Sequence, residues 1–462
     1  MSTVVAIGTW LVVGVVLVTI VLQTVLYLAA GREMQQLGSR TRNQLWRRVL
    51  SSPLAPRISI LVPAYNEEAW IASSVASVLA LTYPDLEVVV VNDGSSDDTM
   101  ERLIERFDLS PVLPIYQRRL PSAHVRTIHR SLIESQLIVV DKDNGGKADA
   151  LNMALNMATG DLVCVIDADT IVRPDALQQL VSPFLYNPDT VAVGGTVRLV
   201  NGIGADETPK QSLPAPRSLL AGVQAVEYVR AFLVGRLGWN ALGGNLIISG
   251  AFGLFVRESV IDVGGYNTDT VGEDMELVVR LRRHAYEVGG PNHVEFLPSP
   301  VAWTEVPESW RTLARQRNRW FRGLLDVLVR HRVMMGRPRY RSAGLIALPY
   351  FLIVESLAPL IELVGLLLVA TGLVTGFVSP DVLAPIAVAY LLSMAISTLI
   401  LMLDDVTFAH YPGLASRLRM ISFVIAEQLV FRPATLVWRA WGLSLFLQGR
   451  KEWGVQERKG LA

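Results

Sequence analysis

The sequence predicts an α/β domain with a mostly parallel sheet, joined to an α-helical transmembrane region. Apolar residues are gathered in long uncharged blocks near both ends of the chain, and short apolar runs alternate with helical patterns between them. Of the 462 residues, 51% are hydrophobic and 18% charged, whereas soluble proteins carry about 25% charged residues. The formal net charge of +0 gives no support for a nucleic-acid partner, and the single cysteine excludes a disulfide scaffold.

The first predicted element is an N-terminal transmembrane helix in residues 1–31. Val4 to Ala30 holds no charged residue, and about 20 apolar residues at ~1.5 Å rise are enough to span a bilayer core. A cleaved signal peptide would need a basic segment before a shorter apolar run, and no Lys or Arg precedes this one. Residues 32–56 form a basic juxtamembrane segment. The positive-inside rule therefore places the N-terminus outside and the following domain in the cytoplasm.

Residues 57–305 have soluble composition and form the predicted α/β domain. Short apolar runs predict strands at 57–63, 86–92, 135–140 and 162–167, and amphipathic patterns predict helices at 71–79, 99–107 and 147–157. Strands that alternate with helices favour a parallel sheet covered on both faces. Periodicity fades between Asp108 and Ile133, which we interpret as an insertion or loop. Sheets of this kind bind ligands beyond the carboxyl ends of their strands.

Acidic residues stand where two of these strands end and where a later helix begins. Asp93 follows one strand, and Asp167 and Asp169 follow another. Two carboxylates one residue apart at a strand exit can hold Mg²⁺ or Mn²⁺ together with a diphosphate. Asp274 opens a helix expected over Met275–Arg283, where it fits either a general base or a favourable charge at a helix start. Each aspartate alone is equally typical of a turn or helix cap.

The C-terminal part is predicted to be membrane-associated. Residues 306–342 are expected to form interfacial amphipathic helices, 343–449 transmembrane and interfacial helices, and 450–462 a cytoplasmic tail. Arg311 to Arg341 contains ten arginines and a single acid. Beside an apolar region, a basic collar that faces anionic headgroups is a better interpretation than a nucleic-acid patch.

The number of C-terminal crossings stays open. Three full crossings would place the tail outside, so one segment, preferably Ile421 to Leu447, is expected to be interfacial or a partial hairpin. A re-entrant break near Pro359 is the alternative. Glu355 and Glu362 lie within the apolar block on one helical face. Such groups either line a polar path through the membrane or bond to Arg or Trp at its interface.

Seven motifs occur in order along the chain, and together they resemble the family 2 membrane glycosyltransferases, which include cellulose, hyaluronan, chitin and poly-N-acetylglucosamine synthases. The motifs are Pro63-Ala64-Tyr65-Asn66-Glu67, Asn92-Asp93-Gly94-Ser95-Ser96-Asp97, Gly146-Lys147-Ala148-Asp149-Ala150-Leu151-Asn152, Asp167-Ala168-Asp169, Ser249-Gly250-Ala251-Phe252, Gly272-Glu273-Asp274 and Gln316-Arg317-Asn318-Arg319-Trp320. The acidic motif usually begins with Thr, and Gly272 stands there in this chain.

The resemblance implies a GT-A-type catalytic domain in residues 57–305 and an inverting transfer from a nucleotide sugar. Asp274, with Glu273, would form the catalytic acidic pair, and Asp274 would be the general base. Asp169 and Asp167 would hold Mg²⁺ or Mn²⁺. The resemblance also assigns donor binding to Asp93, Tyr65, Glu67, Lys147 and Asp167, and acceptor or diphosphate binding to Gln316, Arg319, Trp320, Ser249, Gly250 and Phe252.

The implied function is a processive β-glycosyltransferase that polymerises a UDP-sugar, preferably UDP-N-acetylglucosamine, and passes the exopolysaccharide across the membrane. Its partners would be the donor, the growing polysaccharide, the lipid bilayer and an export or regulatory subunit, with no nucleic acid. The expected location is the bacterial inner membrane, with several crossings. A non-processive enzyme that glycosylates a lipid acceptor is the main alternative. A non-catalytic transporter or regulatory subunit is a further alternative.

Overall fold

The computed structural model describes residues 2–42, 55–168, 170–201, 214–376, 383–408 and 411–450. The predicted metal ligand Asp169, part of the basic segment (43–54) and the tail from residue 451 therefore lie outside the described residues. The chain divides into two compact units. We call Gln35–Val200 with Asn245–Glu305 the sheet unit, and Met1–Met34, Asn201–Gly244 and Val306–Arg458 the helical unit.

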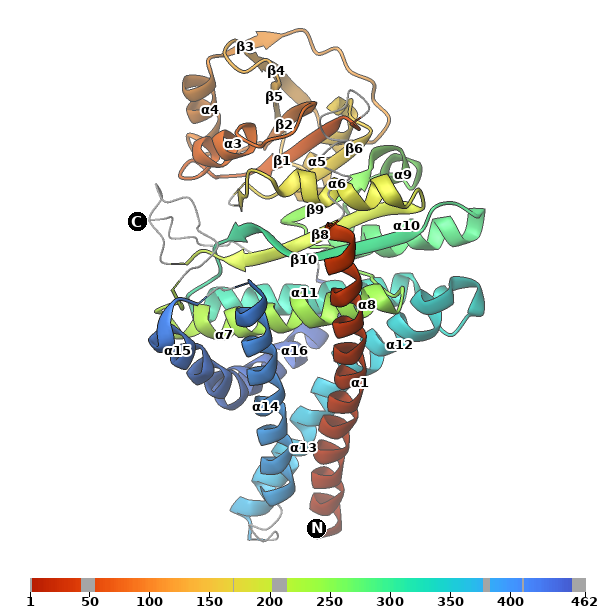
Figure 1. Ribbon diagram of the computed structural model, residues 1–462, viewed down its shortest axis with the longest axis vertical. Helices are drawn as coiled ribbons and strands as arrows, with labels where there is room; N and C mark the ends of the chain where they lie inside the picture. The colour runs from red at the N-terminus through yellow and green to blue at the C-terminus, as the bar shows by residue number, and fades with distance from the viewer. Residues whose placement is uncertain are drawn as a thin grey trace. The chain divides into compact units, whose positions relative to one another are not determined.

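The sheet unit contains a ten-stranded sheet in the order β3-β4-β5-β2-β1-β6-β9-β8-β10-β7 (Figure 1). The strands are β1 (Ile58–Ala64), β2 (Leu86–Asp93), β3 (Leu109–Val112), β4 (Val125–Ser131), β5 (Leu137–Lys142), β6 (Leu162–Ile166), β7 (Ile171–Val172), β8 (Thr190–Leu199), β9 (Phe252–Val256) and β10 (His293–Thr304).

The parallel part of the sheet is confined mainly to its centre. The neighbouring strands β5, β2, β1 and β6 run parallel, and β10 pairs with β8 in the same sense. The sheet is mixed, because β3, β4, β7 and β9 join it antiparallel. Each residue of β2 is buried, as expected for a β-branched run at the centre of a sheet.

The prediction of an insertion or loop at 108–133 is wrong in part, because this stretch supplies β3, the edge strand of the sheet, and β4, which lies between β3 and β5. Only three of the seven residues in β4 are buried, Ile128, His129 and Ser131. They show neither the continuous apolar run of a buried strand nor clean alternation. A strand as exposed as β4 leaves too weak a hydrophobic pattern to be recognised from the sequence.

Among the described residues of the sheet unit, the helices are α3 (Ile71–Leu79), α4 (Thr99–Phe107), α5 (Lys147–Met157), α6 (Ala176–Tyr186), α9 (Arg257–Asp262) and α10 (Glu273–Val288). An apolar core joins the central strands to α5 and α10, and includes Val89, Val140, Leu151, Val165 and Leu277. This core fixes the first turns of α5 and α10 beside the carboxyl end of β6.

The described part of the helical unit consists of α-helices, π-helical stretches (η1, η4, η5 and η7) and short 3₁₀ helices (η2 and η3). Its elements are α1 (Ser2–Arg42), α7 (Leu219–Val229), η1 (Arg230–Arg236), α8 (Leu237–Ala241), α11 (Trp310–Arg330), η2 (Arg332–Met334), η3 (Pro338–Tyr340), η4 (Ala343–Ala347), α12 (Leu348–Tyr350), η5 (Phe351–Leu357), α13 (Ala358–Val374), α14 (Leu383–Phe408), α15 (Gly413–Ala426), η7 (Glu427–Phe431) and α16 (Arg432–Leu447).

By length and composition, four helical segments in the described residues could cross a membrane: Trp10–Gln35, Ala343–Val374, Leu383–Phe408 and Gly413–Leu447. Helices α1, α13 and α14 lie side by side (Figure 1) and share an apolar cluster around Val16 and Ala389. A Cβ built on Gly365 would lie 2.3 Å from Val12, so only a glycine permits this approach of α13 to α1.

Asn201 and residues 214–244 group with the helical unit, although the predicted α/β domain included them. Helix α7 approaches α15 so closely that a Cβ on Gly222 would lie 2.3 Å from the ring of Phe423. The buried Gln224 donates a hydrogen bond to the carbonyl of Pro307, 2.9 Å away, just before α11. The sheet unit is therefore interrupted by a helical segment that packs elsewhere.

The acidic residues of the apolar block are bound to arginines, which supports the second of their two interpretations. Both oxygens of Glu362 accept hydrogen bonds from Arg432, at 3.0 and 2.8 Å, and one also accepts from Tyr390 at 2.7 Å. Arg439 lies 3.6 Å from the carboxylate of Glu355. An intramembrane charge is tolerated when a partner of opposite charge satisfies it.

Candidate functional site

The loops after β1 and β2 are bonded to each other. Asn66 adopts a left-handed backbone with φ 55°, its amide donates to Ser95 at 3.0 Å, and its side chain accepts from the amide of Ser96 at 2.8 Å. The amide of Glu67 donates to Thr99 at 2.9 Å. These bonds place two predicted donor-binding residues, Glu67 and the half-exposed Tyr65, beside the loop that follows Asp93.

Asp93, also predicted to bind the donor, is buried and organises the turn before α5. Its carboxylate pairs with the fully buried Lys142 and accepts from the amides of Gly145 and Gly146 at 3.0 and 2.7 Å. Gly146 has φ 88°, a conformation that favours glycine. Lys142 also pairs with Asp149, at 2.7 Å. This network sets the start of α5 and therefore the position of Lys147.

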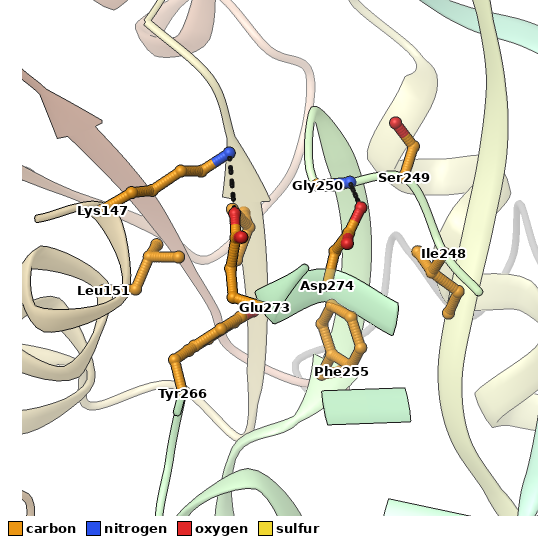
Figure 2. A pocket seen from close by; sticks show the side chains of 10 residues that line it. Lys147, Leu151, Ile248, Ser249, Gly250, Phe255, Tyr266, Glu273 and Asp274 are labelled. Carbon is orange, nitrogen blue, oxygen red and sulfur yellow. Dashed lines mark hydrogen bonds and ion pairs between the residues drawn. The ribbon is translucent and has the colours of Figure 1, made fainter. Parts of the chain in front are cut away.

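A pocket with about 260 Å³ of empty space lies at the carboxyl end of β6 and the start of α10. Figure 2 shows that Lys147 and Glu273 approach it from one side, and Ser249, Gly250 and Asp274 from the other. The polar lining is Lys147, Ser249, Glu273 and Asp274, and the apolar lining includes Leu151, Val165, Ile248, Phe255 and Tyr266. Motifs distant in the sequence therefore meet at one site.

Lys147 is the cation of this pocket. Its ammonium lies 2.6 Å from Asp167 and 3.7 Å from Glu273, and the side chain of Glu273 is 7% exposed. Burial alone would lower the pKa of Lys147, but the charges of Asp167 and Glu273 outweigh it and hold the pKa above its ordinary value. Lys147 is therefore charged at neutral pH and neutralises two of the predicted site carboxylates.

Asp274 has a different environment from its two acidic neighbours. One carboxylate oxygen accepts from the amide of Gly250 at 3.3 Å, and the other accepts from the amide of Met275 at 2.8 Å. Within the described chain, Asp274 forms no ion pair. A Cβ added to Gly250 would lie 3.4 Å from the Lys147 ammonium and 3.5 Å from Asp274. This glycine therefore lies close to both functional groups.

Tyr266 and Phe255 line the pocket but were not predicted from the sequence. Asn152 holds the backbone of Tyr266 through two hydrogen bonds of 2.7 and 2.9 Å. Burial, and next the charges of Glu273 and Asp274, raises the pKa of the Tyr266 phenol well above its usual range. The predicted Phe252 is fully buried and three residues from Phe255 along β9, so it faces the opposite side of the sheet.

The metal prediction rests on Asp167 and Asp169, of which only Asp167 is described. Asp167 lies directly after β6, is partly exposed, and already attracts the ammonium of Lys147. A carboxylate in this position is a suitable ligand for a hard cation such as Mg²⁺ or Mn²⁺. No cluster of three His, Cys, Asp or Glu side chains suited to a metal is found in the described residues.

The remaining predicted residues, Gln316, Arg319 and Trp320, lie on α11 in the helical unit. Ser309 caps this helix by accepting a hydrogen bond from the amide of Thr312 at 3.2 Å. Gln316 and Arg319 are half-buried, and Trp320 is 42% exposed. The motif thus places an exposed aromatic ring beside a half-buried guanidinium on one short stretch of helix.

Comparison with known proteins identifies relatives of the chain. The model of a glycosyltransferase-like family 2 matches residues 56–323, more than half of the chain. Poly-β-1,6-N-acetyl-D-glucosamine synthase from Staphylococcus aureus strain COL is 32% identical over 276 residues, which cover 59% of this chain and 56% of that protein. The same enzyme from Staphylococcus epidermidis is 30% identical over 273 residues, with the same coverage. The match therefore spans little more than half the length of these relatives.

A solved structure also shares the fold. A mannosyltransferase from Pyrobaculum calidifontis, in complex with GDP-Man and Mn²⁺, superposes with a TM-score of 0.56. It is 18% identical to this chain, and the superposition covers 91% of this chain and 99% of the mannosyltransferase. At this identity the likeness concerns the fold alone.

Proposed function

The chain belongs to glycosyltransferase family 2, and on that basis we propose that it is an inverting, processive β-glycosyltransferase that polymerises a UDP-sugar. The observation that carries the proposal is the pocket in which Lys147, Glu273 and Asp274 converge at the carboxyl end of β6. The fold is the GT-A type that the sequence implied, with several helices long enough to span a membrane.

Asp274 is the general base of the proposed reaction. The acceptor hydroxyl attacks the anomeric carbon of the donor sugar, its proton passes to the Asp274 carboxylate, and the bond from that carbon to the nucleoside diphosphate breaks. Asp274 suits this role because it lies in the pocket and forms no ion pair among the described residues. The amides of Gly250 and Met275 orient its carboxylate without neutralising it.

Lys147 binds the diphosphate of the donor. Its ammonium contacts Asp167 and Glu273, and its positive charge favours an anionic ligand in the same place. Asp93 supports this function indirectly, because it fixes the turn that begins α5. We assign Tyr65 and Glu67, on the loop after β1, to the nucleoside, because Glu67 is bonded to Thr99 beyond the loop that follows Asp93.

Asp167 and Asp169 would hold Mg²⁺ or Mn²⁺. Asp167 fits this assignment because its carboxylate stands at the strand end beside the pocket and already attracts a cation. A divalent ion bound there supplies electrostatic stabilisation to the departing diphosphate. The mannosyltransferase that shares the fold was solved with GDP-Man and Mn²⁺, which is consistent with this assignment.

The favoured donor is UDP-N-acetylglucosamine, because the staphylococcal relatives are poly-N-acetylglucosamine synthases. The acceptor is the growing polysaccharide, which Gln316, Arg319 and Trp320 contact. We assign the enzyme to the bacterial inner membrane, with the sheet unit in the cytoplasm and the polymer passing outward, and the long apolar helices support this assignment.

A donor assay tests this proposal. The full chain in detergent or nanodiscs is incubated with labelled UDP-N-acetylglucosamine, UDP-glucose or UDP-glucuronate and with Mg²⁺ or Mn²⁺. We expect UDP release and a high-mass labelled product from UDP-N-acetylglucosamine. UDP release without a high-mass product would refute polymerisation, and a glycolipid product would establish a lipid acceptor instead.

A further inference from the structure

Trp320 is an exposed ring in the middle of α11, next to buried residues. Its neighbours Arg317 and Asn318 are buried, whereas Trp320 is 42% exposed. A large aromatic side chain with this exposure has a broad surface available to a ligand and little packing of its own to fix its rotamer. A neighbouring side chain is therefore needed to hold the ring in one orientation.

Arg317 covers one face of this ring. Its guanidinium carbon lies 4.3 Å from the centroid of Trp320, one helical turn along α11. The guanidinium is 5.8 Å from the ring of Phe431 in η7. Residues three apart on a helix share a face, so the contact follows from helix geometry. Cation–π attraction is strongest for Trp and increases when the cation is desolvated.

Arg317 is itself fixed by a second helix. Glu227 on α7 accepts a hydrogen bond from one guanidinium nitrogen at 3.1 Å and pairs with another at 2.7 Å. The side chain of Arg317 is only 9% exposed. The second contact is an ion pair and not a hydrogen bond. A planar guanidinium that contacts one carboxylate through two nitrogens is nevertheless restrained in its orientation, which the rotatable ammonium of a lysine is not. Contacts therefore connect Glu227 on α7, through Arg317, to the exposed indole of Trp320.

We propose that Arg317 is a positioning residue that holds the Trp320 indole with one face free for the terminal sugar of the acceptor, and that Glu227 orients Arg317. The inference rests on the proposed function, since it concerns how an acceptor is bound. Arg317 contacts neither donor nor acceptor. It acts by keeping the ring in place, so its loss weakens acceptor binding and shortens the product while leaving donor binding intact.

A double-mutant cycle tests the proposal. Arg317→Lys, Trp320→Ala and the combined variant are compared for the KM of an oligosaccharide acceptor, for product length and for donor binding. Arg317→Lys alone should raise the acceptor KM about ten-fold, because an ammonium can contact the ring but lacks the planar guanidinium that Glu227 holds against it. In the Trp320→Ala background the same change should have almost no further effect, because the ring it positions is gone. Glu227→Gln should reproduce a weaker form of the Arg317→Lys effect.

Arg330→Lys on the same helix is the matched control, because Arg330 pairs locally with Asp326 at 2.7 Å. It should leave the acceptor KM unchanged. Additive effects of Arg317→Lys and Trp320→Ala would overturn the inference, as would equal losses of donor and acceptor binding. A wild-type chain that makes no polymer from any donor would instead refute the proposed function, so the two failures are distinguishable.

Discussion

The buried Glu362 of the helical unit and the partly buried Asp274 of the sheet unit are bound in different ways. In the helical unit, Glu362 accepts two hydrogen bonds from Arg432 and one from Tyr390. Glu427 is bound in a similar way by both terminal nitrogens of Arg230, at 3.2 and 2.9 Å. In the sheet unit, Asp274 accepts only backbone hydrogen bonds, and no ion pair reaches it within the described residues.

This difference separates carboxylates that hold the fold from one that can react. A carboxylate bound by a bidentate arginine has little remaining capacity to accept a proton or a ligand. Asp274 keeps that capacity because its partners are amides at a helix start and its side chain lines a pocket. Buried charge alone does not identify a functional residue, and the completeness of its hydrogen bonding is the better criterion.

The largest expected effect comes from Asp274→Asn. The variant keeps the shape of the side chain but cannot accept the acceptor proton, so glycosyl transfer should fall roughly 100- to 10,000-fold. Donor binding, measured by titration with UDP, should stay within about two-fold of wild type, because Lys147 and Asp167 are untouched. Glu287→Gln, at the far end of α10, is the control and should keep full activity. Substantial turnover by Asp274→Asn would show that Asp274 is not the general base.

Glu362→Gln should mainly lower stability, whereas Asp274→Asn should mainly lower activity. The change leaves Arg432 buried without its counter-charge, which is expected to destabilise the helical unit by about 3–5 kcal/mol. Thermal unfolding in detergent would measure the loss. The double variant Glu362→Leu with Arg432→Leu removes both charges and should recover most of it. A Glu362→Gln protein of normal stability would show that the comparison overstates the role of this pair.

The sequence predicted the regular parts of the sheet unit well. Helices α3, α4 and α5 have the predicted ends, and the central strands differ from prediction by at most two residues at either end. These elements carry strong local signals, either continuous apolar runs or clear helical periodicity. The weakly patterned β4 carried no such signal and was missed.

The side chains of the site were harder to predict because their contacts are not local. Lys142 stands at the end of a strand, where a lysine is typical of an exposed position, yet Asp93 and Asp149 hold it fully buried. Phe252 was chosen over Phe255, and a shift of three positions along a strand reverses the face. Glu362 and Arg432 are 70 residues apart, so no spacing in the sequence could indicate their pairing.

Gly250→Ala should lower catalytic activity moderately and leave the stability of the protein unchanged. The new methyl group would lie at ordinary contact distances of 3.4 and 3.5 Å from Lys147 and Asp274, so the protein should fold normally. The methyl group would nevertheless occupy space between the ammonium and the carboxylate. We expect kcat to fall about ten-fold, less than the ~100-fold that a displacement of about 1 Å in a site can cost. Unchanged kcat with unchanged stability would place the reacting groups elsewhere.

The smallest expected effect is on the pH dependence of stability, and it distinguishes the ion-paired Lys147 from Asp274. The pKa of Lys147 is held above its ordinary value of about 10.4, chiefly by Asp167 once burial is overcome. Its contribution to stability is therefore complete below that ordinary value and is lost only as the pH rises above it. Between about pH 7 and 9, the difference in unfolding free energy between wild type and Lys147→Met should be constant. If that difference shrank across this range, Lys147 would be losing its proton there. Asp167 and Glu273 would then lose the positive charge that pairs with them, and they would no longer differ from Asp274 in this respect.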